Sequence, residues 1–158
     1  MIDSSFPSAQ PAIEQLDDQP NLLMGLIGGA VAMLVGAVIW GAVSYLTEYQ
    51  IGWMALGVGF LVGTAVKFFG KGKSMAFGVS SAVLALIGCV LGNLIFYSGI
   101  IAREQSASFL QVFFILLFSP AATLEVFRIA FGFMDILFYA LAAYVGFSAA
   151  LDIRRRRK

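Results

Sequence analysis

Long stretches that are nearly free of charge alternate along the chain with short segments in which the charges gather. A helix needs about 20 predominantly apolar residues to cross about 30 Å of hydrocarbon. Four stretches meet this requirement: 22–46, 51–69, 74–102 and 133–151. The pattern therefore predicts an all-α, polytopic membrane protein whose membrane domain, residues 22–151, contains four transmembrane helices.

Two of the links between these stretches are short. The segment 47–50 is a tight link, so the first two helices should form an antiparallel hairpin, since short links join antiparallel neighbours. Gly70–Lys73 is a short basic turn in which glycine and lysine alternate. Glycine makes such a turn flexible.

The third link, 103–132, is long and contains a second apolar run. As a helix, the ten residues 109–118 would reach only about 15 Å, which is half of a bilayer. The residue before Pro120 is disfavoured in the α conformation, so we expect two short helices, over 109–118 and 121–131, that are interfacial or re-entrant. The alternative is a fifth spanning helix over 109–131, which would bury a proline and two charged residues.

The composition excludes two classes of protein. Hydrophobic residues make up 60% of the 158 residues and charged residues only 12%, whereas a soluble domain is about 45–50% apolar and about 25% charged. A disordered chain would be polar and rich in charge. At this length we expect one domain.

The charges are also segregated. Residues 1–21 carry only acidic charges and form a predicted flexible tail, whereas 152–158 form a basic tail. Because Lys and Arg gather on the cytoplasmic side, we predict a multi-pass protein of the bacterial inner membrane with both termini cytoplasmic and 103–132 outside. The basic residues, which we expect to contact membrane lipids and not nucleic acid, are Lys67, Lys71, Lys73, Arg154, Arg155, Arg156, Arg157 and Lys158.

Small residues recur at four-residue spacing within the predicted helices. Lipid tails are as apolar as leucine, so membrane helices associate through close backbone approach at small residues. We interpret these residues as packing seams, either within the bundle alone or also at an interface with another copy or another membrane protein. The glycines concerned are Gly25, Gly29, Gly36, Gly59, Gly63, Gly88, Gly92 and Gly146.

Asn93 and Asp135 are the candidate membrane-embedded polar residues, because polar and ionisable groups within a span are costly and often functional. Asp135 lies in the first turn of the last predicted helix, where a carboxylate also complements the helix dipole. A helix-start acid and a proton or cation site both remain open. Asn93 should hydrogen-bond a neighbouring helix, and a pair with Asp135 is one hypothesis. Glu125 and Arg128 can pair on one helical face or stay solvated.

Few groups in the sequence could catalyse a reaction. The chain has no histidine and a single cysteine, Cys89, whose apolar surroundings favour a packing role. Gly72-Lys73-Ser74 resembles the end of a phosphate-binding loop, but the full motif needs a glycine at position 67, which is a lysine. We therefore expect no catalytic residues, no metal site and no cofactor.

A resemblance to a known domain rests on several segments of the chain. These are the run from Tyr49 to Gly63, Gly70–Gly72, Gly88-Cys89 with Leu91-Gly92-Asn93, and Phe133–Tyr139 with Tyr144 and Gly146. Together they resemble a widespread, uncharacterised bacterial four-span membrane domain, over about residues 47–147. The resemblance implies the fold and the membrane location. It implies no activity and no site residues.

These observations lead to two expectations about function. The first is a non-catalytic scaffold or accessory subunit that packs with itself or with a larger membrane complex. The second is an oligomeric channel or transporter subunit for an ion or small solute, in which Asp135 and Asn93 would line the path. An enzyme is the weakest of the alternatives, because no acid pair or activated nucleophile is present.

Overall fold

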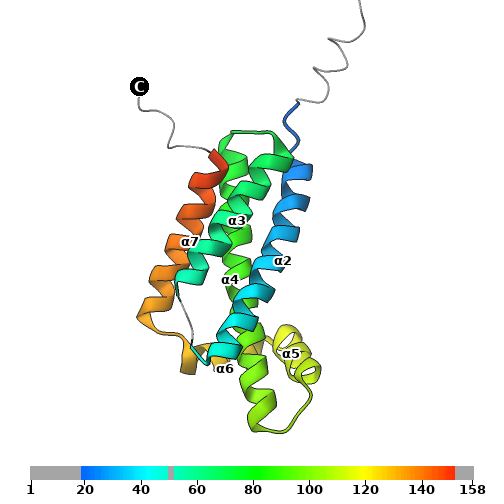
Figure 1. Ribbon diagram of the computed structural model, residues 1–158, viewed down its shortest axis with the longest axis vertical. Coiled ribbons are helices and arrows are strands. Elements are labelled where there is room, and N and C mark those ends of the chain that lie inside the picture. The colour runs from blue at the N-terminus through cyan, green and yellow to red at the C-terminus, as the bar shows by residue number, and fades with distance from the viewer. Residues whose placement is uncertain (1–18, 50–51, 152–158) are drawn as a thin grey trace, which may run out of the picture.

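The computed structural model describes residues 19–49 and 52–151, and every regular element within these ranges is a helix. Figure 1 shows four long helices side by side and two short helices across one end. In chain order the helices are α2 (Leu22–Thr47), α3 (Trp53–Gly70), α4 (Met75–Glu104), α5 (Phe109–Phe118), α6 (Pro120–Ala130) and α7 (Phe133–Leu151).

The four long helices form one bundle, and each is long and apolar enough to cross a membrane. α3 and α4 contact each other and both of the remaining long helices, so α2 and α7 flank this central pair. The predicted four-helix membrane fold is confirmed. The observed helix ends differ from the predicted ones by at most two residues. For example, α3 begins at residue 53, where 51 was predicted, and α4 ends at residue 104, where 102 was predicted.

The ends of α2 and α3 have clear local causes. Asn21 caps α2, since its side-chain oxygen accepts a hydrogen bond of 3.2 Å from the backbone of Met24. The backbone N–H of Asn21 also donates to the carbonyl of Gly70 at 2.9 Å, which ties the start of α2 to the α3–α4 turn. Glu48 and Lys71 end α2 and α3 in the left-handed conformation, which helices commonly use to stop.

The core lies between the long helices, and their outer faces are apolar. Trp40, Val62 and Val66 are the largest hydrophobic side chains that are fully buried. Large apolar side chains cover the outside of α2, as at Val31 and Val38, which are 58% and 57% exposed. In water such a surface would drive association, whereas in a bilayer it meets lipid tails of the same polarity.

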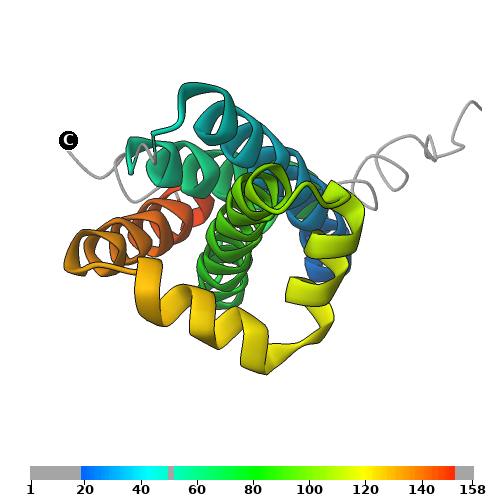
Figure 2. The same cartoon turned by 90° about the horizontal axis from the view of Figure 1, so that it is seen from below.

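α5 and α6 are joined at Ser119 by a bend of 100°. Ser119 ends α5 and also caps α6, because its hydroxyl accepts from the backbone of Ala122 at 3.4 Å. Figure 2 shows the pair running around the end of α4. The break was therefore predicted at the correct residue, α6 begins one residue earlier than expected, and a straight fifth span over 109–131 is not formed.

A second apolar cluster attaches the bent pair to α4. Leu94 and Ala102 of α4 are buried with Val112 and Leu116 of α5, and Phe127 of α6 packs on this cluster. The pair covers the end of the bundle at which α2 and α4 finish and α7 begins. We call this the α5–α6 end, and the opposite end, at which α3 turns into α4, the basic end.

Candidate functional site

Three helices meet at one partly buried polar contact. Asn93 of α4 is fully buried, and its side-chain amide donates a hydrogen bond of 2.8 Å to the hydroxyl of Tyr139 on α7. Trp40 of α2 packs edge-on against Tyr139, with ring centroids 6.5 Å apart. The indole of Trp40 also lies against Gly92, so the small residue beside Asn93 makes room for the largest side chain of the core.

Two buried polar atoms of α2, four residues apart, are unsatisfied. Within the described residues, Trp40 Nε1 and Ser44 Oγ are buried and have no hydrogen-bond partner. Burying a polar group in this way costs about 1–3 kcal/mol. We call Trp40, Asn93 and Tyr139 the polar centre. It consists of neutral hydrogen-bonding groups, which suit adhesion between helices better than the transfer of protons or ions.

Asp135 lies one turn before Tyr139 on α7. Its carboxylate accepts a hydrogen bond of 2.8 Å from the backbone N–H of Gly132, the residue that precedes the helix. This is the return bond of a capping box, in which an acid three residues into a helix satisfies the first N–H group. The geometry gives Asp135 a helix-start role. A direct pair between Asn93 and Asp135 stays a prediction, since the bond described for Asn93 reaches Tyr139.

The backbones of α3 and α7 touch at glycines. A Cβ atom added to Gly59 would lie 2.3 Å from the carbonyl oxygen of Ala142, and one added to Gly63 would lie 2.5 Å from that of Gly146. The same Gly146 carbonyl accepts a hydrogen bond of 2.8 Å from the buried hydroxyl of Ser81 on α4. Three helices are therefore held together at Gly146.

The remaining predicted packing glycines also face neighbouring helices. A Cβ atom added to Gly25, Gly29 or Gly36 would meet α3, one added to Gly92 would meet α2, and one added to Gly88 would meet both α3 and α2, at 2.5 to 3.3 Å. Gly57 of α3 is different, because nothing lies within 4 Å of its added Cβ. The seams are thus used within one chain.

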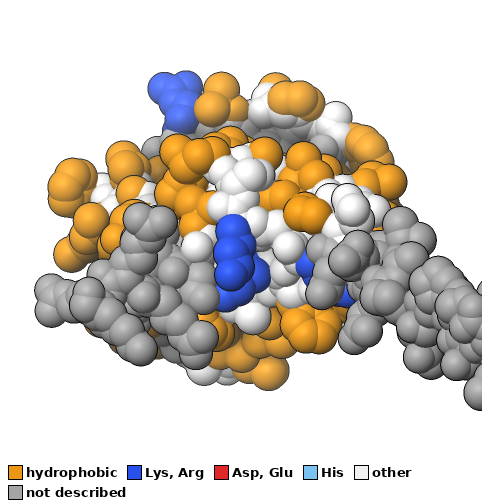
Figure 3. Space-filling model, turned by 90° about the horizontal axis from the view of Figure 1, so that it is seen from above, with side chains coloured by type: hydrophobic (Ala, Val, Ile, Leu, Met, Phe, Trp, Pro, Cys, Tyr) orange, Lys and Arg blue, Asp and Glu red, His pale blue; other side chains and the backbone are white. Residues whose placement is uncertain are grey.

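The described lysines lie at the basic end. Lys71 and Lys73 are exposed in the α3–α4 turn and Lys67 lies in the last turn of α3. Figure 3 looks onto this end and shows basic side chains among apolar ones, with no acidic side chain among the described residues in view. The predicted basic residues 154–158 lie outside the described residues.

Among the described residues, two ion pairs lie at the α5–α6 end. Arg103 and Glu48 approach to 2.6 Å and join the ends of α4 and α2, with both side chains 63% exposed. Glu125 and Arg128 face each other across one turn of α6 at 4.0 Å. Sequence reasoning missed the first pair and missed Tyr139. A signal for the pair was present, because Glu48 and Arg103 are the first charges after two spans that end on the same side.

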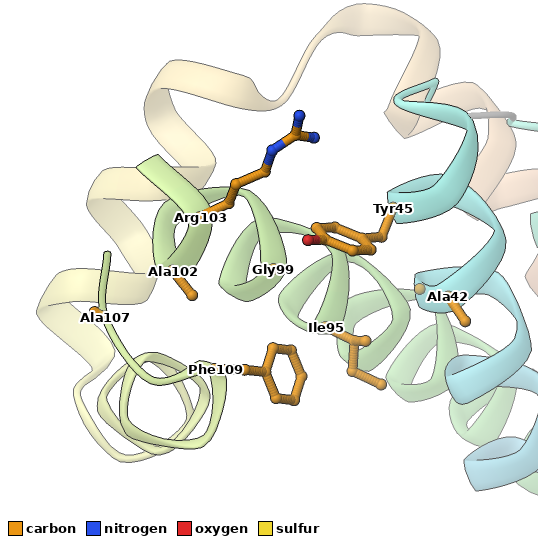
Figure 4. Close-up of a pocket in the computed structure, with 9 residues that line it drawn as sticks. Ala42, Tyr45, Ile95, Gly99, Ala102, Arg103, Ala107 and Phe109 are labelled. Carbon is orange, nitrogen blue, oxygen red and sulfur yellow. The ribbon is translucent and has the colours of Figure 1, made fainter. Parts of the chain in front are cut away.

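An apolar groove of about 500 Å³ opens beside the first ion pair. Figure 4 shows Tyr45 and Arg103 along its upper edge and the ring of Phe109 opposite Ile95. We call it the Arg103 groove. The residues that line it are Gly41, Ala42, Tyr45, Ile95, Gly99, Ala102, Arg103, Ala107 and Phe109.

A second groove of about 470 Å³ lies on the outer flank of α2 and α3. Its lining is entirely apolar, and we call it the α2–α3 groove. It is lined by Met24, Ile27, Gly28, Val31, Ala32, Val35, Leu61, Ala65 and Phe69.

The described part of the chain holds no cluster of His, Cys, Asp or Glu side chains that could bind a metal ion. Cys89, the single thiol, is fully buried. No family model, no curated protein and no solved structure matches this chain. The sites above therefore stand on their own geometry.

Proposed function

We propose that this protein is a non-catalytic scaffold or accessory subunit of a bacterial inner membrane, and that it binds a transmembrane helix of another copy or of a larger complex. The α2–α3 groove carries the proposal. Its lining includes the small residues Gly28, which lies against the side chain of Phe69, and Ala32, together with exposed bulkier side chains such as Val31 and Leu61.

The small residue Ala32 in this lining supports helix docking, because small residues let two backbones approach closely. α2 packs against α3 and α4, so this flank points away from the bundle. The groove lies along the first half of α2, between Met24 and Val35, and thus runs parallel to an incoming spanning helix.

The orientation of the protein belongs to the same proposal. Lys67, Lys71 and Lys73 lie at the basic end, and Arg103 and Arg128 at the opposite end. Short basic segments favour the cytoplasmic side, which supports a cytoplasmic basic end and, with an even number of spans, cytoplasmic termini.

A channel or transporter subunit is supported less well. The carboxylate of Asp135 caps α7, and the amide of Asn93 bonds Tyr139 inside the bundle. A conducting path needs a continuous lining of polar groups. In this proposal both residues instead stabilise the junction of α4 and α7.

The proposal is tested by filling the α2–α3 groove. We expect the full chain, purified in mild detergent, to have the mass of a defined homo-oligomer or hetero-complex by native mass spectrometry. Val31→Trp should convert it to the monomer, because the indole blocks the groove. Val83→Trp on α4 is the matched control, since Val31 is 58% and Val83 50% exposed.

Two results would contradict the proposal. One is a wild-type protein that stays monomeric in both detergent and nanodiscs. The other is a solute flux in proteoliposomes that Asp135→Asn abolishes while the fold is retained, which would establish the transport alternative instead.

A further inference from the structure

The Arg103 groove has the shape and the chemistry of a site for an amphiphile. Its walls come from the last turns of α2 and α4 and from the start of α5. Gly41 and Gly99 keep the two long helices close here, because an added Cβ would lie 2.4 Å from Ile95 at Gly41 and 2.6 Å from Tyr45 at Gly99. The groove therefore depends on small residues on both helices.

We propose that the Arg103 groove binds one anionic phospholipid from the surrounding bilayer. An acyl chain lies along Ile95, Ala102 and Phe109, and the phosphate meets the guanidinium of Arg103 and the hydroxyl of Tyr45 at the edge. This assignment is independent of the scaffold function proposed above, because that function rests on a different flank of the bundle.

The charge arrangement favours a headgroup with a phosphate. Arg103 carries five N–H donors in a planar fork that fits phosphate, and the contact with Glu48 joins Nη1 to one carboxylate oxygen. Both side chains are 63% exposed, and exposed ion pairs of this kind are weak. A phosphate can therefore share or replace Glu48 as the partner of Arg103.

The depth of the groove favours a lipid over a protein helix. It lies at the ends of α2 and α4, at the level where charged headgroups border the hydrocarbon core. Tyr and Trp side chains prefer this level, and Tyr45 stands at the edge of the groove (Figure 4). The α2–α3 groove, in contrast, has no charged residue in its lining and offers nothing to a headgroup.

The test compares phosphatidylglycerol with phosphatidylcholine of identical acyl chains, both added to the purified full chain in detergent. Native mass spectrometry then counts the lipids retained per chain. We expect one retained phosphatidylglycerol, retained at least severalfold more than phosphatidylcholine. Arg103→Gln should remove this preference. Glu48→Gln should increase it, because the competing carboxylate is gone while the arginine remains.

A bulky substitution tests the contribution of the apolar groove separately from that of the Arg103 charge. Ala42→Trp places an indole in the groove, since Ala42 is exposed and lines it, and it should lower the retention of both lipids. Ala76→Trp, at an exposed alanine of α4 near the basic end, is the control and should retain both.

Three outcomes would overturn the assignment. The first is equal retention of the two lipids by the wild type. The second is unchanged retention in both Arg103→Gln and Ala42→Trp. The third is a lipid-free dimer that Ala42→Trp dissociates, since the occupant would then be a second copy of the chain. Arg103→Gln should remove the preference for phosphatidylglycerol, and Glu48→Gln should increase it. If one of these variants folds poorly, the other still tests the assignment.

Discussion

At the scale of single residues, glycines decide how closely the helices approach. Gly59 and Gly63 place the backbone of α3 directly against that of α7. A backbone atom cannot rotate away as a side chain can, so an added methyl group must push the helices apart. Gly28 differs, because its added Cβ would meet the side chain of Phe69, down to the Cβ atom of that residue, and not a backbone atom.

We predict that Gly59→Ala lowers the free energy of unfolding by about 1–3 kcal/mol, the usual cost of overpacking a core. The measurement is a denaturation titration in detergent micelles. Gly57→Ala is the matched control on the same helix, because nothing lies within 4 Å of its added Cβ. Alanine is a better helix former than glycine, so this control should be neutral or stabilising.

A loss of stability in Gly57→Ala as large as that in Gly59→Ala would contradict the prediction. It would mean that glycine acts here through helix flexibility. The contact between the backbones of α3 and α7 would then not be the source of the stability.

The polar residues show where the sequence stops being informative. The burial of Asn93 follows from its place in a span, and the helix-start role of Asp135 follows from its place in the first turn. The partner of Asn93 does not follow, because Asp135 and Tyr139 lie four residues apart on the same face of α7, and the choice between them depends on how far α7 is shifted along its axis. A hydrophobic pattern does not define that axial position when the whole helix is apolar.

At the scale of elements, the bend at Ser119 depends on three adjacent features. Ser119 caps α6, Pro120 stands at the first position of α6, and the hydroxyl of Thr123 donates to the carbonyl of Leu116 in the last turn of α5. Ser, Pro and a return bond together stop one helix and start the next. This is why the break could be predicted from the sequence.

We predict that Ser119→Ala destabilises α6 locally by about 1 kcal/mol, the typical cost of losing a helix cap. Hydrogen exchange should then accelerate by roughly fivefold over 121–124, since 1.4 kcal/mol is a factor of 10. Ser119→Asp restores a capping oxygen and should keep the wild-type rate. Equal acceleration in both variants would show that the cap does not hold the bend.

The position of α5 and α6 against the bundle was harder to predict from the sequence. Ten apolar residues in α5 are compatible with an interfacial, a re-entrant or a spanning helix. The position of α5 against the bundle comes from packing, because Val112 and Leu116 are buried with Leu94 and Ala102 at the end of α4. These contacts join residues far apart in the chain, and a local pattern does not contain them.

At the scale of the whole molecule, the described charges divide between the two ends. Lys71 and Lys73 lie in the α3–α4 turn, whereas Glu48, Arg103 and Glu125 lie at the α5–α6 end. Four spans place these ends on opposite sides of a bilayer.

We predict that single cysteines at 73 and 125, in a Cys89→Ala background, react with a membrane-impermeant maleimide from opposite sides of the membrane. In intact cells the thiol at 125 should react, and the thiol at 73 should react only after lysis, because lysines favour the cytoplasmic side. Labelling of both thiols in intact cells would contradict the four-span arrangement.

The contact of Gly59 and Gly63 with α7 also has a consequence for biosynthesis. α7 follows α2, α3 and α4 in the chain, so these three helices are synthesised first, while the glycine face of α3 is still uncovered. The long connection through α5 and α6 delays its closure further. A nascent chain that stops before residue 133 would therefore leave Gly59 and Gly63 of α3 uncovered.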